Sequence, residues 1–509
     1  MDFDLIFESI GEFGWQQKKY VFIILMLNGY SSWHMLQYSF VGYQMPFTCL
    51  ALDQDTPYHN QCPGNSAGKC EKIEFDTSKE STVVSEWTLV CDQAHLGPMV
   101  MSVFMLGVLI GALVMGILAD AFGRKKTLIL AFTCMLISNF VSGHCIDFRW
   151  YLSSRFVDGF FTSGNILVSF VLSNEIIGAS IRGPLGTLLQ SFFALGIMLF
   201  ACVARFVTNW RSLTLLTSAI GLPLIVTIGY LPESPRWLYA NGHPKRAIDV
   251  VKTIAENNGT KLNPKHISKE ESTEFGQNEA RVGVTSLLTV SSLRRITLIQ
   301  IFSWFVNSMT YYGLTIAAAG TGDRYQSTFM SGFVELFAYA LTYTFLPKLG
   351  RRVTLCGFMV LGGLPLTLLL VLPNGEWLVY AIAMWSKTCI AGSFAVAYIH
   401  SGEIFPTCIR NSAMGLVSMA ARAGGIASPY VAEMRGEAVP NLHLVVFGLA
   451  TLSSGLLNTR LPETQDLPLP DTLEELTERL EMTTPDSKTR YQPLKTLNND
   501  INSETFVPV

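Results

Sequence analysis

A few ionisable residues interrupt the long apolar runs of this chain, and they are the first candidates for chemistry. Glu335 lies in the middle of one run, Arg422 near the middle of another, and Lys387 in the outer half of a third. Charge at such a depth is costly, so each residue is a candidate for function. An arginine can hold a carboxylate through two hydrogen bonds, and a glutamate can pair with an ammonium group. Together they suit a zwitterion or an anion.

The competing interpretation is structural. Glu335 and Arg422 could form a pair that only ties two helices together, although buried pairs add little net stability. Arg155 and Asp158 form a second charged group in the outer half of the run 150–173.

Aromatic and polar side chains could complete a binding pocket. The π faces of aromatic rings attract cations, although packing is the better explanation for any single ring. The candidates are Trp304, Phe305, Tyr311 and Tyr312 in the run 296–318, and Phe192, Phe193 and Gln190 in the run 184–206.

The first apolar run carries an unusual number of polar residues. Unpartnered polar groups are expensive in lipid, so this face is expected to line a cavity. Its polar members are Asn28, Ser31, Ser32, His34 and Gln37. His34 could sense protons, but a neutral hydrogen-bonding histidine is more common.

The positions of these charges matter only if the runs cross a membrane. Only 15% of the residues are charged. The apolar residues come in blocks of about 20, the length that a helix needs to cross a bilayer. Twelve spans are predicted, at roughly 20–42, 97–119, 127–146, 150–173, 184–206, 210–231, 296–318, 326–346, 353–372, 376–399, 411–433 and 440–460.

The second half of the chain repeats the first in the same order. Six spans in each half, with the same orientation, indicate a parallel repeat with substrate bound between the halves. Arg155 corresponds to Lys387 in this repeat. The matching motifs are Gly123-Arg124-Lys125 with Gly350-Arg351-Arg352, Glu175 and Arg182 with Glu403 and Arg410, and Leu231-Pro-Glu-Ser234 with Leu461-Pro-Glu-Thr464.

The basic residues predict the topology. Arg124, Lys125, Lys126, Arg351 and Arg352 lie between spans, and the stretch 232–295 is also rich in Lys and Arg. By the positive-inside rule these segments and both termini are cytoplasmic. The acidic segment 43–96 is then extracellular. The N-terminus lacks a signal-peptide cleavage pattern, so the first span must direct insertion.

The predicted extracellular segment holds four cysteines. Cys49, Cys62, Cys70 and Cys91 are expected to form two disulfides, with three connectivities open. No histidines accompany them at ligand spacing, so no metal site is expected. No catalytic triad or phosphate loop lies in a water-accessible segment, so neither an enzyme nor a bound cofactor is predicted, and nothing indicates nucleic-acid binding.

Charged residues at the predicted cytoplasmic helix ends recur in both halves. They could pair across the halves in one conformation and separate in another, which would bias a two-state equilibrium; the alternative is that they only set topology. The proposed gating residues are Asp120, Arg124, Glu175, Arg182, Glu233, Arg236, Glu403, Arg410 and Glu463, while Gly107, Gly111 and Gly116 are expected to allow close helix packing.

Several longer motifs resemble one family. They are Ile10-Gly-Glu-Phe-Gly-Trp-Gln16, Ser85-Glu-Trp-Thr-Leu-Val-Cys-Asp92, Pro232-Glu-Ser-Pro-Arg-Trp-Leu238, Tyr311-Tyr-Gly-Leu314 and Gly402-Glu-Ile-Phe-Pro-Thr-Cys-Ile-Arg-Asn411. From residue 3 to about residue 480 the chain is similar to the organic cation/anion/zwitterion transporters, solute carrier family 22, closest to the member 15 and carnitine-type branch. The chain departs from the family in lacking a glycosylation site in the extracellular segment, in having Thr48 where a histidine is usual before Cys49, and in having Ala121 where an arginine is usual.

The resemblance implies an all-α membrane protein of the major facilitator fold that resides in the plasma membrane. It implies that the position of Arg422 is basic in anion and carnitine-type members and acidic in cation members, that Tyr311 and Tyr312 belong to a family motif, and that Gln190 contacts substrate. The expected function is transport of small organic ions by alternating access, for zwitterions or organic anions such as carnitine- or ergothioneine-like molecules. Alternatives are an organic cation transporter, a sugar porter and a substrate sensor that does not transport.

The expected domains are an N-terminal half, 1–231, with the extracellular segment 43–96; a linker, 232–295, with short helices; a C-terminal half, 296–462; and a mostly disordered tail, 463–509. Tyr491-Gln-Pro-Leu494 resembles a sorting signal and Val507-Pro-Val509 a PDZ ligand, but chance matches are favoured for both. The sequence does not predict a co-transported ion.

Overall fold

The computed structural model describes residues 3–51, 58–60, 62, 70–78, 80–260, 286–319, 323–372, 375–406, 409–434 and 441–465. The predicted tail, with its sorting and PDZ patterns, therefore lies outside the described residues, apart from 463–465. The same is true of 261–285 within the predicted linker.

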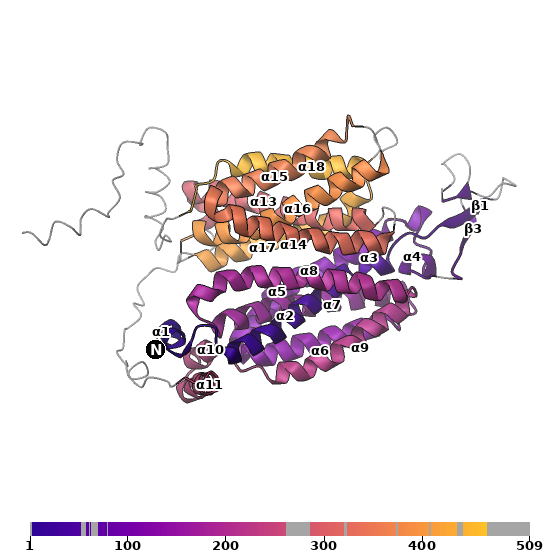
Figure 1. The fold of residues 1–509 in the computed structure, drawn as a ribbon. Coiled ribbons are helices and arrows are strands. Elements are labelled where there is room, and N and C mark those ends of the chain that lie inside the picture. The colour runs from indigo at the N-terminus through magenta and orange to yellow at the C-terminus, as the bar shows by residue number, and fades with distance from the viewer. Residues whose placement is uncertain are drawn as a thin grey trace, which may run out of the picture.

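Long helices form two stacked bundles (Figure 1). The N-terminal half contains α2 (Trp15–Leu36) with α3 (Tyr38–Val41), α5 (Leu96–Phe122), α6 (Arg124–Ser142), α7 (Phe148–Glu175), α8 (Arg182–Phe206) and α9 (Trp210–Gly229). The C-terminal half contains α13 (Ser291–Ala319), α14 (Arg324–Leu349), α15 (Arg351–Leu368), α16 (Glu376–Ile404), α17 (Arg410–Ala432) and α18 (Leu442–Asn458). This architecture confirms the predicted fold class of twelve helices in two six-helix repeats.

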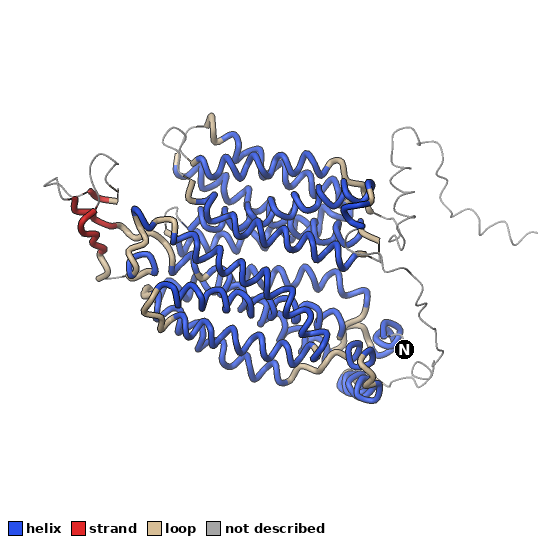
Figure 2. Tube along the Cα trace, turned by 180° about the vertical axis from the view of Figure 1, so that it is seen from behind, coloured by secondary structure: helices blue, strands red, loops and turns tan. Residues whose placement is uncertain are grey.

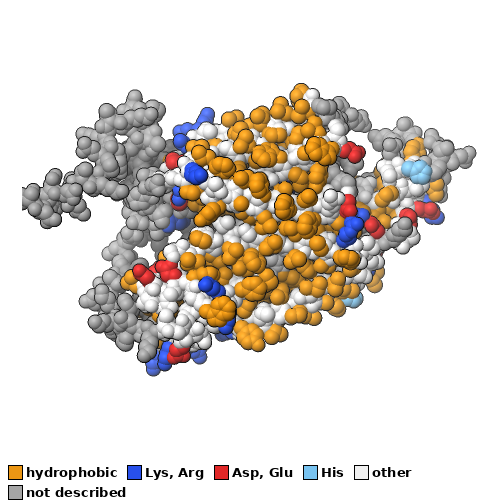
Figure 3. Space-filling view, viewed as in Figure 1, with side chains coloured by type: hydrophobic (Ala, Val, Ile, Leu, Met, Phe, Trp, Pro, Cys, Tyr) orange, Lys and Arg blue, Asp and Glu red, His pale blue; other side chains and the backbone are white. Residues whose placement is uncertain are grey.

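Length and composition alone identify fewer of these helices as membrane spans. In the described part of the chain, seven helices are long and apolar enough to cross a membrane. Polar or charged residues within α2, α13, α15 and α17, and the shortness of α18, explain why the others fall below such a threshold. An apolar surface nevertheless covers the middle of both halves, with charged side chains gathered at the two ends (Figure 3).

One end of the molecule, here named the loop end, carries the small extramembrane subdomain that contains strands (Figure 2). Its sheet has the order β2-β1-β3, formed by β1 (Phe47–Ala51), β2 (Tyr58–His59) and β3 (Cys70–Phe75), all antiparallel. α4 (Val83–Glu86) and the 3₁₀ turn η1 (Cys91–Gln93) lead into α5. The disulfides join Cys49 to Cys70 and Cys62 to Cys91, which confirms the predicted pairing and supplies the connectivity.

The opposite end, named the linker end, carries the short helices α1 (Phe3–Ile10), α10 (Pro235–Ala240), α11 (Pro244–Asn257) and α12 (Ser286–Thr289). The 3₁₀ turn η2 (Ala179–Ile181) joins α7 to α8. Asn258 fastens this layer to the first long helix, because its side-chain oxygen accepts from the backbone of Gln16 at 3.0 Å and its amide donates to Gln17 at 3.2 Å.

Small residues let the helices approach closely. A Cβ at Gly107 would lie 2.1 Å from the carbonyl oxygen of Phe156, and one at Gly111 would lie 2.2 Å from that of Phe160. The predicted close approach therefore holds at these two positions. At Gly116 a Cβ would meet only ordinary contact, 3.6 Å from Leu167.

Candidate functional site

The C-terminal half buries a charged pair between two helices. Lys387 Nζ, on α16, lies 3.2 Å from Glu335 Oε1, on α14, and both side chains are fully enclosed. Glu335 also accepts from the Tyr311 hydroxyl, at 2.9 Å to each carboxylate oxygen, and the lysine lies over the Tyr311 ring at 4.8 Å. Thr315 accepts a further hydrogen bond from the lysine. The competing structural interpretation, a pair of Glu335 with Arg422, does not hold in this structure, because the cation beside Glu335 is Lys387.

Arg422 is therefore left without a carboxylate in the described part of the site. It is half-buried on α17, and its Nε atom is buried without a hydrogen-bond partner among the described residues. Its guanidinium interacts with Tyr312, a buried tyrosine on α13. A planar cation with unused donors can hold a carboxylate through two parallel hydrogen bonds.

Arg422 and Tyr312 lie where the two halves meet. The Tyr312 hydroxyl is 3.7 Å from the sulfur of Met35, on α2 of the other half. Four residues beyond Arg422, the carbonyl of Ile426 accepts from Ser102 on α5 at 2.8 Å. α17 packs against α5, and α14 packs against α8. Arg422 therefore lies close to the interface between the two halves.

The other predicted aromatic residues have different environments. Trp304 is fully buried, donates to Ser401 at 2.9 Å and packs edge-on against Tyr398, so it is part of the core of the C-terminal half. Gln190 and Phe193 are half-buried on α8, the helix that packs against the Glu335 helix. Phe192 and Phe305 are also half-buried.

The N-terminal half buries its own charged cluster. Arg155 and Asp158, both on α7, pair at 2.5 Å. The arginine also donates to Gln37 Oε1 at 2.8 Å and to the His34 carbonyl at 3.2 Å. His34 Nδ1 lies 2.8 Å from the other oxygen of Asp158. This group is named the His34 cluster.

The prediction that the polar face of the first span lines a cavity is not supported in this structure. Asn28, Ser31, Ser32, His34 and Gln37 are all buried. They bond within their own half: Asn28 donates to the Leu189 carbonyl at 2.7 Å, and Gln37 to Thr214 at 3.0 Å. Polar residues in a span can be satisfied by neighbouring helices as well as by water.

The repeated charges at the linker end pair within each half. Arg124 lies 3.1 Å from both Asp120 and Glu175, and Arg351 lies 3.1 Å from Glu403. Glu175 and Arg182, which the sequence spacing brought together, do not pair with each other. Arg182 instead pairs with Asp4 at 2.5 Å, as does Arg236. The Arg410 side chain donates to the Phe405 carbonyl at 3.1 Å.

Two glutamates cap helices at the same end. Glu233 accepts from the backbone N–H of Arg124 at 2.7 Å, and Glu463 accepts from that of Arg351 at 2.8 Å. A carboxylate at a helix N-terminus is favoured by the helix dipole and the free N–H groups. Burial raises the pKa of Glu463, but hydrogen bonds from the backbone N–H groups of Arg351, Thr464 and Gln465 outweigh it and leave the pKa below its usual value. The cap therefore stabilises α15 at neutral pH and is lost only as the pH falls through that lowered pKa.

The loop end holds contacts that the sequence analysis missed. Arg324, which begins α14, pairs with Glu80 at 2.7 Å and lies 3.3 Å above the Tyr43 ring. Arg205 pairs with Asp323 at 2.8 Å. These contacts, named the loop-end latch, join the two halves. The sequence held a signal for these pairs, because the predicted topology places both acids and both arginines on the extracellular side.

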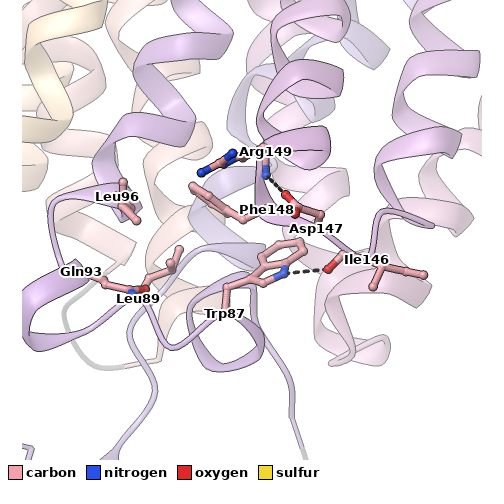
Figure 4. A pocket seen from close by; sticks show the side chains of 8 residues that line it. All are labelled: Trp87, Leu89, Gln93, Leu96, Ile146, Asp147, Phe148 and Arg149. Atoms are coloured by element: carbon pink, nitrogen blue, oxygen red, sulfur yellow. Dashed lines mark hydrogen bonds between the residues drawn. The ribbon is translucent and has the colours of Figure 1, made fainter.

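A pocket of about 360 Å³ also opens at the loop end (Figure 4). Its lining comes from the segment before α5 and from the start of α7, and Trp87 closes one side by donating to the Ile146 carbonyl at 3.0 Å. Asp147 caps α7 by accepting from Arg149. All of the lining residues belong to the N-terminal half, so this pocket does not lie between the halves.

Comparisons with known proteins identify the family and the fold. Residues 40–476 match the family model described as sugar (and other) transporter. The chain is 33% identical to an organic cation transporter protein of Drosophila melanogaster, over 93% of this chain and 94% of the relative. It is 33% identical to solute carrier family 22 member 15 of Xenopus tropicalis, over 94% and 91%, and 33% identical to human solute carrier family 22 member 13, over 79% and 73%.

The chain belongs to solute carrier family 22. Its fold matches the xylose transporter XylE of E. coli in a partially occluded inward-open conformation, with a TM-score of 0.64 at 17% identity, over 91% of this chain and all of the other. This solute carrier family 22 chain is thus a multi-pass membrane transporter of the major facilitator type. Its relatives are solute carriers rather than enzymes.

Proposed function

We propose that this solute carrier family 22 chain carries small organic anions or zwitterions, including carnitine-like molecules, across the plasma membrane by alternating access. The observation that carries the proposal is the charge arrangement between the halves. Glu335 is neutralised by Lys387, whereas Arg422 has no carboxylate in the described part of the site. An uncompensated arginine at the interface favours a substrate with a carboxylate or a similar anionic group.

Tyr311, Tyr312, Gln190 and Phe193 are proposed to line the same site, with Trp304 supporting it from the core. Glu335 and Lys387 contact substrate only if their pair opens. A zwitterion could open it, because its ammonium group would replace the lysine beside Glu335. An anion needs no such exchange.

The alternative function is transport of organic cations. It is favoured by the names of several relatives and by the enclosed carboxylate of Glu335. A cation would have to displace Lys387 and to tolerate Arg422 nearby, and like charges at close range are costly in a low-dielectric site.

Uptake by proteoliposomes distinguishes these possibilities. Radiolabelled p-aminohippurate, L-carnitine and tetraethylammonium serve as anionic, zwitterionic and cationic probes. We expect saturable uptake of the first or second probe and little of the third. Efficient uptake of tetraethylammonium alone would overturn the anion proposal in favour of the alternative, and saturable binding of a probe without uptake would favour a sensor that does not transport.

The alternating access is proposed to work between the two ends. In this structure the latch joins the halves at the loop end, which is proposed to be extracellular because it carries the disulfides. The linker end, which carries α1 and the last described residues, is proposed to face the cytoplasm, as are both termini. Its charges are proposed to act as a gate, because Arg124–Glu175 and Arg351–Glu403 are equivalent pairs in the two halves.

The gate proposal predicts that charge reversal alters the conformational equilibrium rather than folding. Glu175→Lys, Glu403→Lys or Arg410→Glu should reduce uptake at least about tenfold at similar surface expression. The control is Lys252→Glu on α11, whose exposed side chain lies in a weak pair with Glu256. Normal turnover by the reversed variants would leave these residues as topology signals only.

A further inference from the structure

The His34 cluster has no part in the proposed substrate site, yet it contains an unusual histidine. The imidazole of His34 is fully enclosed. Its Nδ1 bonds to Asp158, and its Nε2 is buried with no hydrogen-bond partner among the described residues. A buried polar atom without a partner is costly, so it needs an explanation.

The free nitrogen is the position on the ring where a further proton can bind, because Nδ1 already donates to Asp158. Asp158 carries one negative charge and Arg155 one positive charge, so the cluster is neutral while His34 is neutral. A proton on Nε2 makes the ring a cation whose Nδ1–H already bonds to a carboxylate. The Asp158 carboxylate then lies within hydrogen-bond distance of two cations, the imidazolium and the Arg155 guanidinium.

The groups around the ring come from three helices. Asp158 and Arg155 face it from α7, and Tyr151 lies near both of them on the same helix. On α2 itself, Tyr30 packs edge-on against the imidazole at 5.2 Å and donates its hydroxyl to the Thr217 carbonyl. α5 contributes Phe104, whose ring lies 4.6 Å from the Arg155 guanidinium. Asp158 is thus the acidic group in direct contact with the ring.

The His34 cluster is also next to the interface between the halves. The residue after His34 is Met35, whose sulfur receives the Tyr312 hydroxyl. Tyr312 interacts with Arg422. His34 is therefore separated from the proposed substrate arginine by two residues, Met35 and Tyr312.

We propose that His34 is the binding site for a co-transported proton. One proton passes from water to Nε2 when the cluster is open to one side, and returns to water on the other side after the halves rock. With a monovalent anion on Arg422, each cycle carries one negative and one positive charge, so it is electrically neutral. The proton site stands on its own geometry, while the coupling to an anion rests on the proposed function.

Proton binding can be tested without any substrate. Proteoliposomes on a solid-supported membrane are given a pH jump, and the transient charge displacement is recorded. The wild type should give a displacement that His34→Gln reduces to the level of protein-free liposomes. His144→Gln, at an exposed histidine, is the matched control and should behave like the wild type. A displacement that His34→Gln leaves intact, or none in the wild type, overturns the proposal.

A second variant guards against a folding defect in His34→Gln. Asp158→Asn keeps the shape of the cluster but removes the charge that stabilises the imidazolium, so it should reduce the displacement severalfold. Both variants are compared with the wild type for elution as a single species and for thermal stability. An undiminished displacement in a well-folded Asp158→Asn would also overturn the proposal.

Coupling is measured separately from proton binding. A gradient of one pH unit, acid outside, should raise the accumulation of p-aminohippurate by up to about tenfold at a one-to-one ratio. His34→Gln should abolish this increase. A gradient effect that persists in His34→Gln overturns the proton site. A pH-jump signal without uptake of any probe would instead contradict the proposed function and leave the proton site standing.

Discussion

The two halves bury a basic residue at corresponding positions, but they partner it differently. Arg155 has its acid three residues along the same helix, so the Arg155–Asp158 pair moves with α7 as one unit. Lys387 has its acid on another helix, α14, and that helix packs against α8 of the opposite half. The pair in the C-terminal half therefore depends on how two helices are placed, whereas the pair in the N-terminal half does not. A shift of α14 relative to α16 would therefore break the C-terminal pair, whereas the N-terminal pair would survive any movement of α7 as a unit.

The largest expected effect comes from breaking the C-terminal pair. Lys387→Met leaves Glu335 enclosed without a cation, which should cost about 3–5 kcal/mol of stability. The double variant Lys387→Met/Glu335→Gln should recover most of that loss, because no charge is then left unpaired. Thermal unfolding in detergent measures both. A single variant as stable as the wild type would mean that the pair is not buried as described.

A smaller effect is expected from Arg155→Lys. A lysine can still reach Asp158, but it lacks the planar guanidinium that also donates hydrogen bonds to Gln37 and to the His34 carbonyl. Leaving these buried acceptors unpaired should cost about 1–3 kcal/mol. Arg149→Lys, at an exposed arginine on the same helix, is the control. Equal stability of Arg155→Lys and the control would remove the distinction between the two halves.

The smallest effect is expected at the loop-end latch. Glu80→Gln and Arg324→Gln should each weaken the contact between the halves, with a coupling of about 0.2–1 kcal/mol in a double-mutant cycle, because the pair is partly exposed. The measurement uses a Met35→Cys variant. The rate at which thiol reagents added from outside label this cysteine reports the equilibrium between the joined and separated loop ends of the two halves. The exposed Lys72–Glu74 pair of the same subdomain is the matched control. Additive effects of the two latch substitutions would exclude a direct interaction.

Much of this molecule follows from the sequence because local signals decide it. The apolar runs predicted the bounds of the long helices to within a few residues, although only seven of the described helices pass a test of length and hydropathy alone. The repeat of Gly123-Arg124 in Gly350-Arg351 predicted the order of the halves. Cysteine number predicted the disulfides, but three connectivities satisfied it equally. The partner of Glu335 could not be read from the sequence, because Arg422 and Lys387 are both basic residues in other spans of the same half. Only the packing of α14 against α16 brings Lys387 to Glu335. The prediction that the polar face of α2 lines a cavity was not supported for a related reason. The sequence shows which residues need hydrogen-bond partners, but it does not show which helices supply them.

The central claim is that Arg422 holds the anionic group of the substrate. The most direct test measures binding of p-aminohippurate to purified protein for the wild type, Arg422→Ala, Arg422→Lys and the exposed control Arg460→Ala. Loss of a buried charge partner of a ligand costs about 2–5 kcal/mol, so Arg422→Ala should weaken binding at least about thirtyfold. The affinity of Arg422→Lys should lie between those of the wild type and Arg422→Ala, and the affinity of Arg460→Ala should match that of the wild type. Unchanged affinity in a folded Arg422→Ala would contradict the account and leave Arg422 as a structural residue.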